Sequence, residues 1–403
     1  MKKIFFVLVA YCLLPIVNCF SQGVWTQKAN FSGTARWGSS SFSIGTKGYL
    51  VGGYDGTTNF SDLWEYDPAA NSWAQKAAIP QGRRAACAFA INSKGYVCLG
   101  AHTTNSPTLT DIWEYDPISN SWNAKANFPS SARYGAASFA IGNKGYVCCG
   151  NEGTSAGPYT NELWEFDPAS NTWNAKANFI GNARYGITHS CFVIGTKGYV
   201  GLGGTQSTSF SDFFCYDQAT NAWSTIANYP GSGQSYASGF GICYKGFICA
   251  GKAGSTPYAD CWQYDATSNA WTQQTNFTGG GRWIMTGCVI NGRMYLGTGY
   301  DFVNNYKDWW EYACSEEGIN ELQNQIHVSV FPNPSSGIVK MKCEKEISSV
   351  EILNVLGKKV FVTANNQHLT SCEIDLRKQP KGIYFYLLTT AKGEKATGKL
   401  IIE

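Results

Sequence analysis

A twelve-residue pattern recurs along the chain at a nearly constant spacing. It reads DLWEYDPAANSW from Asp62, DIWEYDPISNSW from Asp111 and ELWEFDPASNTW from Glu162. Its first aromatic position recurs as Trp64, Trp113, Trp164, Phe214, Trp262 and Trp310, separated by 48 to 51 residues. A period of this length is typical of folds in which each unit buries its apolar face against its neighbours. The repeat therefore predicts a scaffold rather than a single catalytic motif.

Each unit carries the signals for four short antiparallel strands. Residues 41–53, SFSIGTKGYLVGG, are two apolar runs joined by a turn, as in a β-hairpin. An Asp-Pro turn and a strand that opens with Asn-x-Trp follow. In the first unit we expect strands near residues 36–44, 48–53, 62–67 and 72–79. With 44 glycines and 15% aromatic residues, the composition agrees with turn-rich β-structure, and six such units predict an all-β, six-bladed β-propeller.

The start of the repeat region contains the strand that its end lacks. Residues 23–31 read GVWTQKANF and match the outer strand NSWNAKANF at 120–128, although no unit precedes them. The sixth unit stops at residues 309–318, WWEYACSEEG, without this strand. We expect residues 23–31 to complete the last blade, because a closed ring leaves no exposed strand edge.

The repeat resembles that of the kelch family, which has a Gly-Gly pair at a strand end and two spaced aromatic residues. Gly52-Gly53 and Gly203-Gly204 keep the pair. The other units relax it, as Leu99-Gly100, Cys149-Gly150, Ala250-Gly251 and Gly297-Thr298. The resemblance implies a six-bladed kelch propeller for residues 22–314.

Residues 1–21 are expected to be a signal peptide. Lys2 and Lys3 precede an apolar stretch at 4–17, and cleavage is expected after Ser21. A lipoprotein with Cys19 as the lipid attachment site is the alternative, although Asn18 fits that motif poorly. No other apolar run approaches the ~20 residues that span a membrane. We therefore expect a mature chain without a transmembrane segment, secreted or attached to the cell surface.

The tail after the repeats has a different pattern. Residues 315–325 read as a polar linker, and residues 326–403 as short alternating strands of a small β-sandwich. This tail resembles the C-terminal sorting domain of the type IX secretion system of Bacteroidota. The residues that carry the resemblance are Pro332, Asn333, Pro334, Gly337, Gly357, Gly382, Tyr384 and Lys399. It implies export across the outer membrane with that secretion machinery as partner; the alternative is a generic binding sandwich.

Cysteines recur at equivalent strand positions. One set is Cys98, Cys148 and Cys249, and the other is Cys87, Cys191 and Cys288. This periodicity favours small buried side chains packed between blades. Secretion also permits disulfides, and Cys343 with Cys372 is the first pair that we would test.

Arginines open the innermost strands of five units. They are Arg36, Arg84, Arg133, Arg184 and Arg282, with Gln234 in the fifth unit. The kelch resemblance implies that this position lies near one mouth of the central channel. Guanidinium groups there would bind a carboxylate or sulfate through paired hydrogen bonds. Their neighbours Trp37, Tyr134, Tyr185 and Trp283 are suited to stacking on a sugar ring or a peptide.

A repeated set of acids offers another interpretation of these arginines. The acids are Asp62, Asp111, Glu162, Asp212, Asp260 and Asp308. Arginines paired with these acids between blades would belong to the scaffold, since a feature of every blade rarely marks one ligand site. Positions that break the repeat are then more informative, because loops on a rigid frame commonly carry function. They are Gln234, Arg83, His102, Glu152, Tyr159 and residues 298–308.

Catalytic motifs are sparse. His102 and His189 occupy non-equivalent positions, so a histidine-based metal site of the galactose oxidase kind is not expected. The sialidase turn Ser-x-Asp-x-Gly-x-Thr-Trp is absent, and no nucleophile elbow or phosphate loop occurs in its required context. We expect neither a metal nor another cofactor. Kelch proteins that mutarotate sialic acid need only a few polar groups in the channel, so the sequence leaves that activity open.

The leading hypothesis is an exported propeller that binds an extracellular glycan or protein. The alternatives are an enzyme that acts on a sugar, such as a sialic-acid mutarotase, and a purely structural surface or adhesion component. Nucleic acid is not an expected partner, since residues 22–318 carry 18 Lys and Arg against 20 Asp and Glu.

Overall fold

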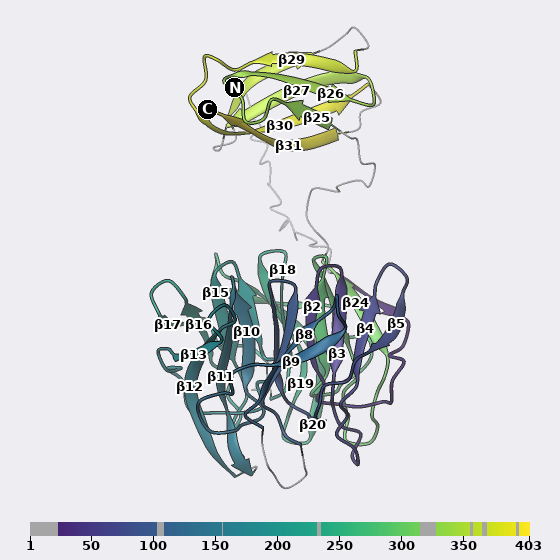
Figure 1. Cartoon of the computed structure of the whole chain (residues 1–403), viewed down its shortest axis with the longest axis vertical. Coiled ribbons are helices and arrows are strands. Elements are labelled where there is room, and N and C mark those ends of the chain that lie inside the picture. The colour runs from purple at the N-terminus through teal and green to yellow at the C-terminus, as the bar shows by residue number, and fades with distance from the viewer. Residues whose placement is uncertain are drawn as a thin grey trace, which may run out of the picture. The chain divides into compact units, whose positions relative to one another are not determined.

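The computed structural model describes residues 23–102, 109–154, 156–231, 235–314, 328–354, 358–364, 369–391 and 395–403. The expected signal peptide and the expected linker lie outside these residues. All the regular structure described is β-strand (Figure 1). The chain divides into two compact units, Met1–Glu317 and Gly318–Glu403.

Six four-stranded sheets form the first unit. Blade one contains β2 (Ser40–Ile44), β3 (Lys47–Val51), β4 (Leu63–Asp67) and β5 (Ser72–Lys76). Blade two contains β6 (Cys87–Ile91), β7 (Lys94–Cys98), β8 (Ile112–Asp116) and β9 (Ser121–Ala124). Blade three contains β10 (Ala137–Ile141), β11 (Lys144–Thr154), β12 (Gly157–Asp167) and β13 (Thr172–Ala175). Blade four contains β14 (Cys191–Ile194), β15 (Lys197–Gly201), β16 (Phe213–Asp217) and β17 (Ala222–Thr225).

Blade five contains β18 (Ser238–Ile242), β19 (Lys245–Ala253), β20 (Thr256–Asp265) and β21 (Ala270–Gln274). Blade six contains β22 (Thr286–Ile290), β23 (Arg293–Gly297) and β24 (Trp309–Ala313), completed by β1 (Val24–Lys28). The expected all-β propeller fold is confirmed, and the number of sheets in the described residues agrees with six blades.

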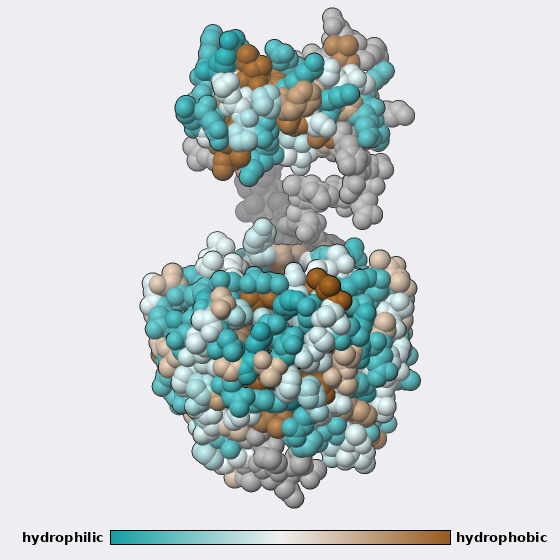
Figure 2. Space-filling view, in the orientation of Figure 1, coloured by the Kyte–Doolittle hydropathy of each residue, from teal (hydrophilic) through white to brown (hydrophobic). Residues whose placement is uncertain are grey.

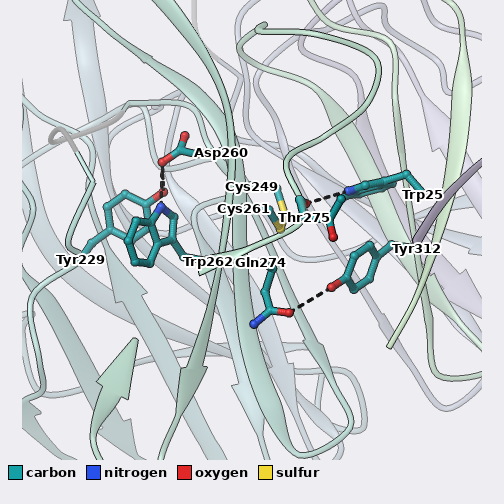
Figure 3. Close-up of a disulfide and its surroundings, with 9 residues drawn as sticks. All are labelled: Trp25, Tyr229, Cys249, Asp260, Cys261, Trp262, Gln274, Thr275 and Tyr312. Atoms are coloured by element: carbon teal, nitrogen blue, oxygen red, sulfur yellow. Dashed lines mark hydrogen bonds between the residues drawn. A yellow bond between two sulfur atoms is a disulfide. The ribbon is translucent and has the colours of Figure 1, made fainter. Parts of the chain in front are cut away.

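The N-terminal strand closes the ring. β1 pairs antiparallel with β24 along its whole length. Trp25 of β1 is buried, and its ring centroid lies 5.0 Å from those of Phe277 and Tyr312. Its Nε1 donates a hydrogen bond to the Thr275 carbonyl at 3.2 Å (Figure 3). The closing strand is therefore held by a buried aromatic side chain as well as by its backbone ladder.

The recurring sequence pattern builds a turn that ties neighbouring blades together. In blade one, Asp67 accepts a hydrogen bond from the Ala69 amide at 2.9 Å. Asn71 has a φ of 48° and accepts hydrogen bonds from the Tyr66 hydroxyl and from the amide of Ala29, both at 2.9 Å. Equivalent asparagines accept from the preceding outer strand at Asn120, Asn171, Asn221 and Asn269. The pattern is thus a scaffold element.

Blade faces pack through aromatic rings over glycines. Phe42 of blade one lies over Gly95 of blade two, where a Cβ atom would come within 2.2 Å of the ring. The same contact joins Phe89 to Gly145 in the next pair of blades. The glycine in each Lys-Gly-aromatic turn is therefore required by close approach between blades.

The second unit is a small β-sandwich. Its sheets have the orders β25-β26-β29 and β28-β27-β30-β31. Its strands are β25 (Val328–Phe331), β26 (Ile338–Cys343), β27 (Ile347–Asn354), β28 (Lys359–Ala364), β29 (Ser371–Asp375), β30 (Gly382–Thr390) and β31 (Lys395–Ile402). Buried side chains of both sheets, such as Met341, Ile352 and Leu388, form one core.

Most cysteines of the repeated sets are buried and free, as expected. They are Cys87, Cys98, Cys148, Cys191 and Cys288. Cys249 is an exception, because it lies opposite Cys261 in the β19–β20 ladder and forms a disulfide with it (Figure 3). A periodicity along one strand does not reveal the partner on the next strand. The pair proposed from the sequence, Cys343 and Cys372, is free.

The propeller surface shows no concentrated apolar region in the view of Figure 2, where hydrophilic and neutral residues predominate. Its large exposed apolar side chains are scattered, at Val24, Ile118, Ile180, Tyr244 and Val303. Single exposed apolar residues are normal for a protein surface. Among the described residues, no helix is long and apolar enough to cross a membrane.

Candidate functional site

Four of the expected arginines lie in buried ion pairs. Arg36 donates from Nη1 to Asp62 Oδ1 at 2.5 Å and from Nη2 to Oδ2 at 2.9 Å, and its side chain is buried. The corresponding pairs are Arg133 with Glu162, Arg184 with Asp212, and Arg282 with Asp308. Each arginine also donates to a backbone carbonyl of its own blade. This geometry supports a scaffold role, because the guanidinium groups are committed to internal partners. The expectation of pairs between blades is wrong, since each pair lies within one blade.

In blade two, the assignment of Arg84 to this set of pairing arginines was wrong. Arg83, not Arg84, makes the pair, with two contacts of 2.8 Å to Asp111. Burial by itself would raise the pKa of the Asp111 carboxyl, but Arg83 holds that pKa below its usual value. Adjacent side chains on an extended backbone point in opposite directions, so Arg84 does not share this position. The spacing already separates the two residues, because Arg83 precedes Phe89 by six positions, as Arg36 precedes Phe42, whereas Arg84 precedes Phe89 by five.

Blade five departs from this arrangement. Gln234, which takes the arginine position in the sequence, lies outside the described residues. The acid of this blade, Asp260, accepts a hydrogen bond from Trp262 Nε1 at 2.8 Å and one from the Tyr229 hydroxyl at 3.2 Å (Figure 3). Aromatic donors therefore contribute to holding the carboxylate here.

The residues that follow the pairing positions surround one end of the central channel, which we call the mouth. They are Trp37, Arg84, Tyr134, Tyr185, Ser235 and Trp283. Each forms a β-bridge to a residue in the last part of the second strand of its blade or just beyond that strand. In the same order, these partners are Tyr54, Ala101, Asn151, Gly204, Lys252 and Tyr300. The mouth thus brings together Tyr134 and Tyr185, with ring centroids 6.0 Å apart.

Backbone hydrogen bonds next to the mouth join each blade to its neighbour. The Gly38 amide donates to the Ile284 carbonyl at 3.0 Å, and the Ala85 amide donates to the Gly38 carbonyl at 2.8 Å. Four further bonds of the same kind complete the circle. In each pair the first residue donates its amide and the second accepts at its carbonyl: Gly135 and Ala85, Ile187 and Gly135, Tyr236 and Gly186, Ile284 and Tyr236. The mouth side chains therefore stand on a hydrogen-bonded frame.

Aromatic side chains of blades one and six form a continuous surface at the mouth, here called the aromatic platform. Its members are Trp37, Tyr54, Trp283, Tyr300 and Phe302. The Trp37 ring centroid lies 5.1 Å from that of Tyr54 and 5.9 Å from that of Trp283 across the seam between the blades. Trp283 in turn lies 5.4 Å from Phe302. Tyr54 is buried and the other four are half-buried, so the platform retains exposed surface.

A cationic side chain lies over each flank of the platform. The Arg84 guanidinium carbon lies 4.6 Å from the Tyr54 ring centroid, and Arg84 Nη1 donates to Asn59 Oδ1 at 2.8 Å. Lys252 Nζ lies 4.3 Å from the Trp283 ring centroid and 5.2 Å from that of Phe302. Burial lowers the pKa of both side chains.

A pocket of about 250 Å³ opens beside Lys252, between blades four and five. The residues that line it are Tyr185, Thr205, Gln206, Ser207, Thr208, Ser209, Ser235, Tyr236, Lys252 and Gly254. Tyr159 stacks on Tyr185 at 5.2 Å, and its hydroxyl accepts a hydrogen bond from the Gln206 amide at 2.8 Å. Ligand pockets for drug-sized molecules start at about 300 Å³, so this pocket suits one sugar ring or one acidic substituent.

A second cavity, of about 110 Å³, lies within the channel. In blade four, Gly195 lies 11 positions after Arg184, whereas in blade three Gly142 lies 9 positions after Arg133. The longer segment brings Thr188 and His189 to the cavity, where Thr188 Oγ1 and His189 Nε2 are buried without a hydrogen-bond partner in the described structure. Burial lowers the pKa of His189 to about 4. At about 30 Å³ per water, the cavity has room for a few molecules that would satisfy these atoms.

The remaining symmetry-breaking residues do not form a metal centre. Within the described ranges, no group of three or more His, Cys, Asp or Glu is placed to hold a metal ion. His102 Nδ1 lies 2.6 Å from the Gly82 carbonyl oxygen. Glu152 lies 3.0 Å from Arg133 Nη2, which also contacts Glu162 at 2.7 Å.

The sequence interpretation missed Lys252 and Tyr54, whereas Tyr300 lies within the segment 298–308 that it singled out. All three follow the glycine-containing strand end, in the triplets GGY, AGK and TGY. Comparing the units one residue beyond that glycine would have revealed them, because this position varies and carries a cation in only one unit; its residues are Tyr54, Ala101, Asn151, Gly204, Lys252 and Tyr300. The interpretation stopped at the glycines, so it assigned the cationic role to the buried arginines.

The expected sorting residues are placed around the last strand of the second unit. Asn333 Nδ2 donates to the Lys399 carbonyl, and Asn333 Oδ1 accepts from the Ile401 amide, each at 2.9 Å. The Tyr384 hydroxyl donates to the Pro380 carbonyl at 2.6 Å. Gly337 has a φ of 115°, and a Cβ there would lie 2.9 Å from the Arg377 Cα. Pro332 and Pro334 flank Asn333, Gly382 begins β30, and Gly357 lies outside the described residues.

Comparisons with known proteins agree with this architecture. A family model described as the KLHDC2/KLHL20/DRC7 Kelch-repeats domain matches residues 19–150. A model described as the secretion system C-terminal sorting domain matches residues 329–403. A solved structure titled "Structure of YjhT" is similar in fold, with a TM-score of 0.60 and 16% identity, over 69% of this chain and 95% of that chain. No curated protein matches the chain.

Proposed function

Because this chain is a kelch-repeat β-propeller protein with a C-terminal sorting domain of the type IX secretion system, we propose that it is an exported binding protein that recognises an extracellular glycan at the mouth. The sorting domain accounts for delivery to the cell surface or beyond. The propeller supplies the rigid frame for recognition.

The aromatic platform is the observation that carries this proposal. A sugar ring has an apolar C–H face and a hydroxylated edge. The half-buried rings of Trp37, Trp283, Tyr300 and Phe302, whose planes are inclined to one another, offer apolar aromatic surface for that face. The pocket beside Lys252 offers hydroxyl and amide groups for the edge. The platform spans blades one and six, and Tyr236 of blade five connects Trp283 to a second aromatic group at the mouth that contains Tyr185.

A sugar-acting enzyme, similar to the sialic-acid mutarotases, is the second candidate. Glu152 favours it, because this carboxylate breaks the repeat and meets Arg133 at 3.0 Å. The same arginine is also paired with Glu162. We rank binding first, because Arg133 is engaged in the scaffold and the platform is half-exposed.

The direct test is binding of the purified full chain to an array of neutral and acidic glycans. We expect Trp37→Ala and Tyr300→Ala each to weaken binding at least about tenfold, as for a central aromatic anchor. The control is Tyr244→Ala, which removes an aromatic residue that is 91% exposed in the β18–β19 turn, at the other end of those strands. Melting curves verify that the variants fold.

Two results would contradict the proposal. One is the absence of binding to any glycan, which would direct the search to protein partners. The other is equal binding by the platform variants and the unaltered chain. Each bound glycan is then followed by proton NMR for hydrolysis or anomer exchange. Turnover that Glu152→Gln abolishes would favour the enzymatic candidate over simple binding.

A further inference from the structure

Lys252 is in a different electrostatic setting from the arginines of the scaffold. The pairing arginines are buried and directed at carboxylates, as in Arg36 with Asp62. The Lys252 ammonium contacts the rings of Trp283 and Phe302 and has no hydrogen-bond or ion-pair partner within the described part of the chain. A half-buried ammonium that meets only ring faces retains its capacity for three hydrogen bonds.

The pocket wall facing this lysine is rich in donors. It is the loop between β15 and β16, which contains Gln206, Ser207, Thr208 and Ser209. The loop backbone is folded on itself, with the Thr208 amide donating to Thr205 Oγ1 at 3.2 Å. The side-chain hydroxyls of Ser207, Thr208 and Ser209 make no hydrogen bond to any described residue. A cation with several hydroxyl donors is a suitable environment for an oxyanion.

Two carboxylates near the platform, those of Asp55 and Asp301, carry negative charge that would repel an anion. Asp55 accepts hydrogen bonds from the Thr57 hydroxyl at 2.8 Å and from the Thr58 amide at 2.7 Å. Asp301 accepts from the amides of Val303 and Asn304 and from the Tyr306 hydroxyl. Both carboxylates are held within their own loops on blades one and six. Neither lines the pocket at Lys252.

We infer that this pocket binds the carboxylate or sulfate group of an acidic sugar, with Lys252 as the cation and the loop of residues 205–209 as hydrogen-bond donor. The inference rests on the proposed function, because the sugar ring stacks on the aromatic platform while its acidic group enters the pocket. The pocket volume of about 250 Å³ fits one such group with part of its ring. Burial lowers the pKa of Lys252, and an anion bound there would offset that shift.

The test compares Lys252→Met, Lys252→Arg and Lys245→Met full chains on an array of neutral, uronate, sialylated and sulfated glycans. Methionine keeps an unbranched side chain against Trp283 without the charge, and arginine keeps the charge. Lys245, paired with Asp265 at the other end of β19, is the matched control. We expect Lys252→Met to weaken binding of acidic glycans about 10- to 100-fold, in line with a hydrogen bond to a charged group. Lys252→Arg and Lys245→Met are expected to retain that binding.

The outcomes separate this inference from the proposed function. Binding confined to neutral glycans would overturn the inference and leave glycan binding intact. Acidic glycans bound equally by Lys252→Met and the unaltered chain would also overturn it. No glycan binding at all would overturn both. Preference for uronates and sialic acids over sulfated glycans would identify a carboxylate as the group in the pocket, and the reverse preference a sulfate.

Discussion

Arg83 and Arg84 are adjacent in the chain but belong to two different systems. Arg83 is buried and lies 2.8 Å from Asp111, whereas the Arg84 guanidinium carbon lies 4.6 Å from the centre of the Tyr54 ring. One residue stabilises the frame and the other contributes to the mouth. We therefore expect substitution of Arg83 to affect mainly the stability of the propeller, and substitution of Arg84 to affect mainly ligand binding at the mouth.

We predict that Arg83→Ala lowers the free energy of unfolding of the propeller by about 3–5 kcal/mol, because it leaves the Asp111 carboxylate without its partner. Arg84→Ala removes ring contacts and the hydrogen bond to Asn59, and is expected to cost less, about 1–2 kcal/mol. Thermal and denaturant unfolding of the two variants measure this difference. Equal losses would show that the two arginines do not play separate roles.

Because β1 closes the ring, substitution of Trp25 is expected to lower the stability of the propeller strongly. Its side chain is buried against Phe277 and Tyr312, so Trp25→Ala is expected to destabilise the propeller by about 3–5 kcal/mol. The neighbouring Val24 is 67% exposed, and Val24→Ala should change stability by less than about 0.5 kcal/mol. Differential scanning calorimetry compares the two variants. A melting curve of Trp25→Ala that matches the unaltered chain would contradict closure by β1.

In the sandwich, Asn333 and Lys399 are expected to respond differently to substitution. Asn333→Ala removes both hydrogen bonds from its amide to β31, at a cost of about 1–3 kcal/mol. Lys399 contributes its backbone carbonyl while its side chain is exposed, so Lys399→Ala should preserve the fold. Hydrogen exchange at the Ile401 amide reports on the contact. Unchanged protection in Asn333→Ala would exclude this role for the side chain.

His189 predicts a pH-dependent stability. Burial lowers its pKa from 6.5 to about 4. The unfolded chain therefore takes up a proton as the pH falls from 6.5 towards 4, while the folded chain does not. Above pH 6.5 the neutral His189 does not lower the free energy of unfolding. Between pH 6.5 and 4 that free energy decreases by up to about 3 kcal/mol, because only the unfolded chain binds the proton. As the pH is lowered from 7 to 4, the melting temperature of His189→Gln should fall less than that of the unaltered chain. Equal dependence of the two melting temperatures on pH would rule out this role for His189.

Much of the architecture was available from local patterns. The hairpin signals, the Asp-Pro turns and the duplicated outer strand at residues 23–31 predicted the all-β propeller and its closing strand. These features are encoded locally, because each depends on turn chemistry and on alternation along a short segment. Buried thiols such as Cys98 and Cys148 followed from the same periodicity.

The candidate site was less accessible to such reasoning. The aromatic neighbours Trp37 and Trp283 were identified, but the cations were sought in the whole set of five arginines, four of which are buried in ion pairs, and Lys252 was missed. The spacing of the repeat aligns Arg83 rather than Arg84 with Arg36, and the structure shows that Arg83 pairs with Asp111, 28 positions further along the chain.

The sequence by itself determined the repeat, the strand content of each blade and the sorting domain, because these depend on residues close together in the chain. Tertiary structure decided which charges are neutralised and which surfaces stay exposed. Arg36 is committed to Asp62 of its own blade, while Lys252 of blade five meets Trp283 of blade six. That distinction arises from contacts across blade seams, where the geometry of packing determines which side chains lie within a few ångströms of each other.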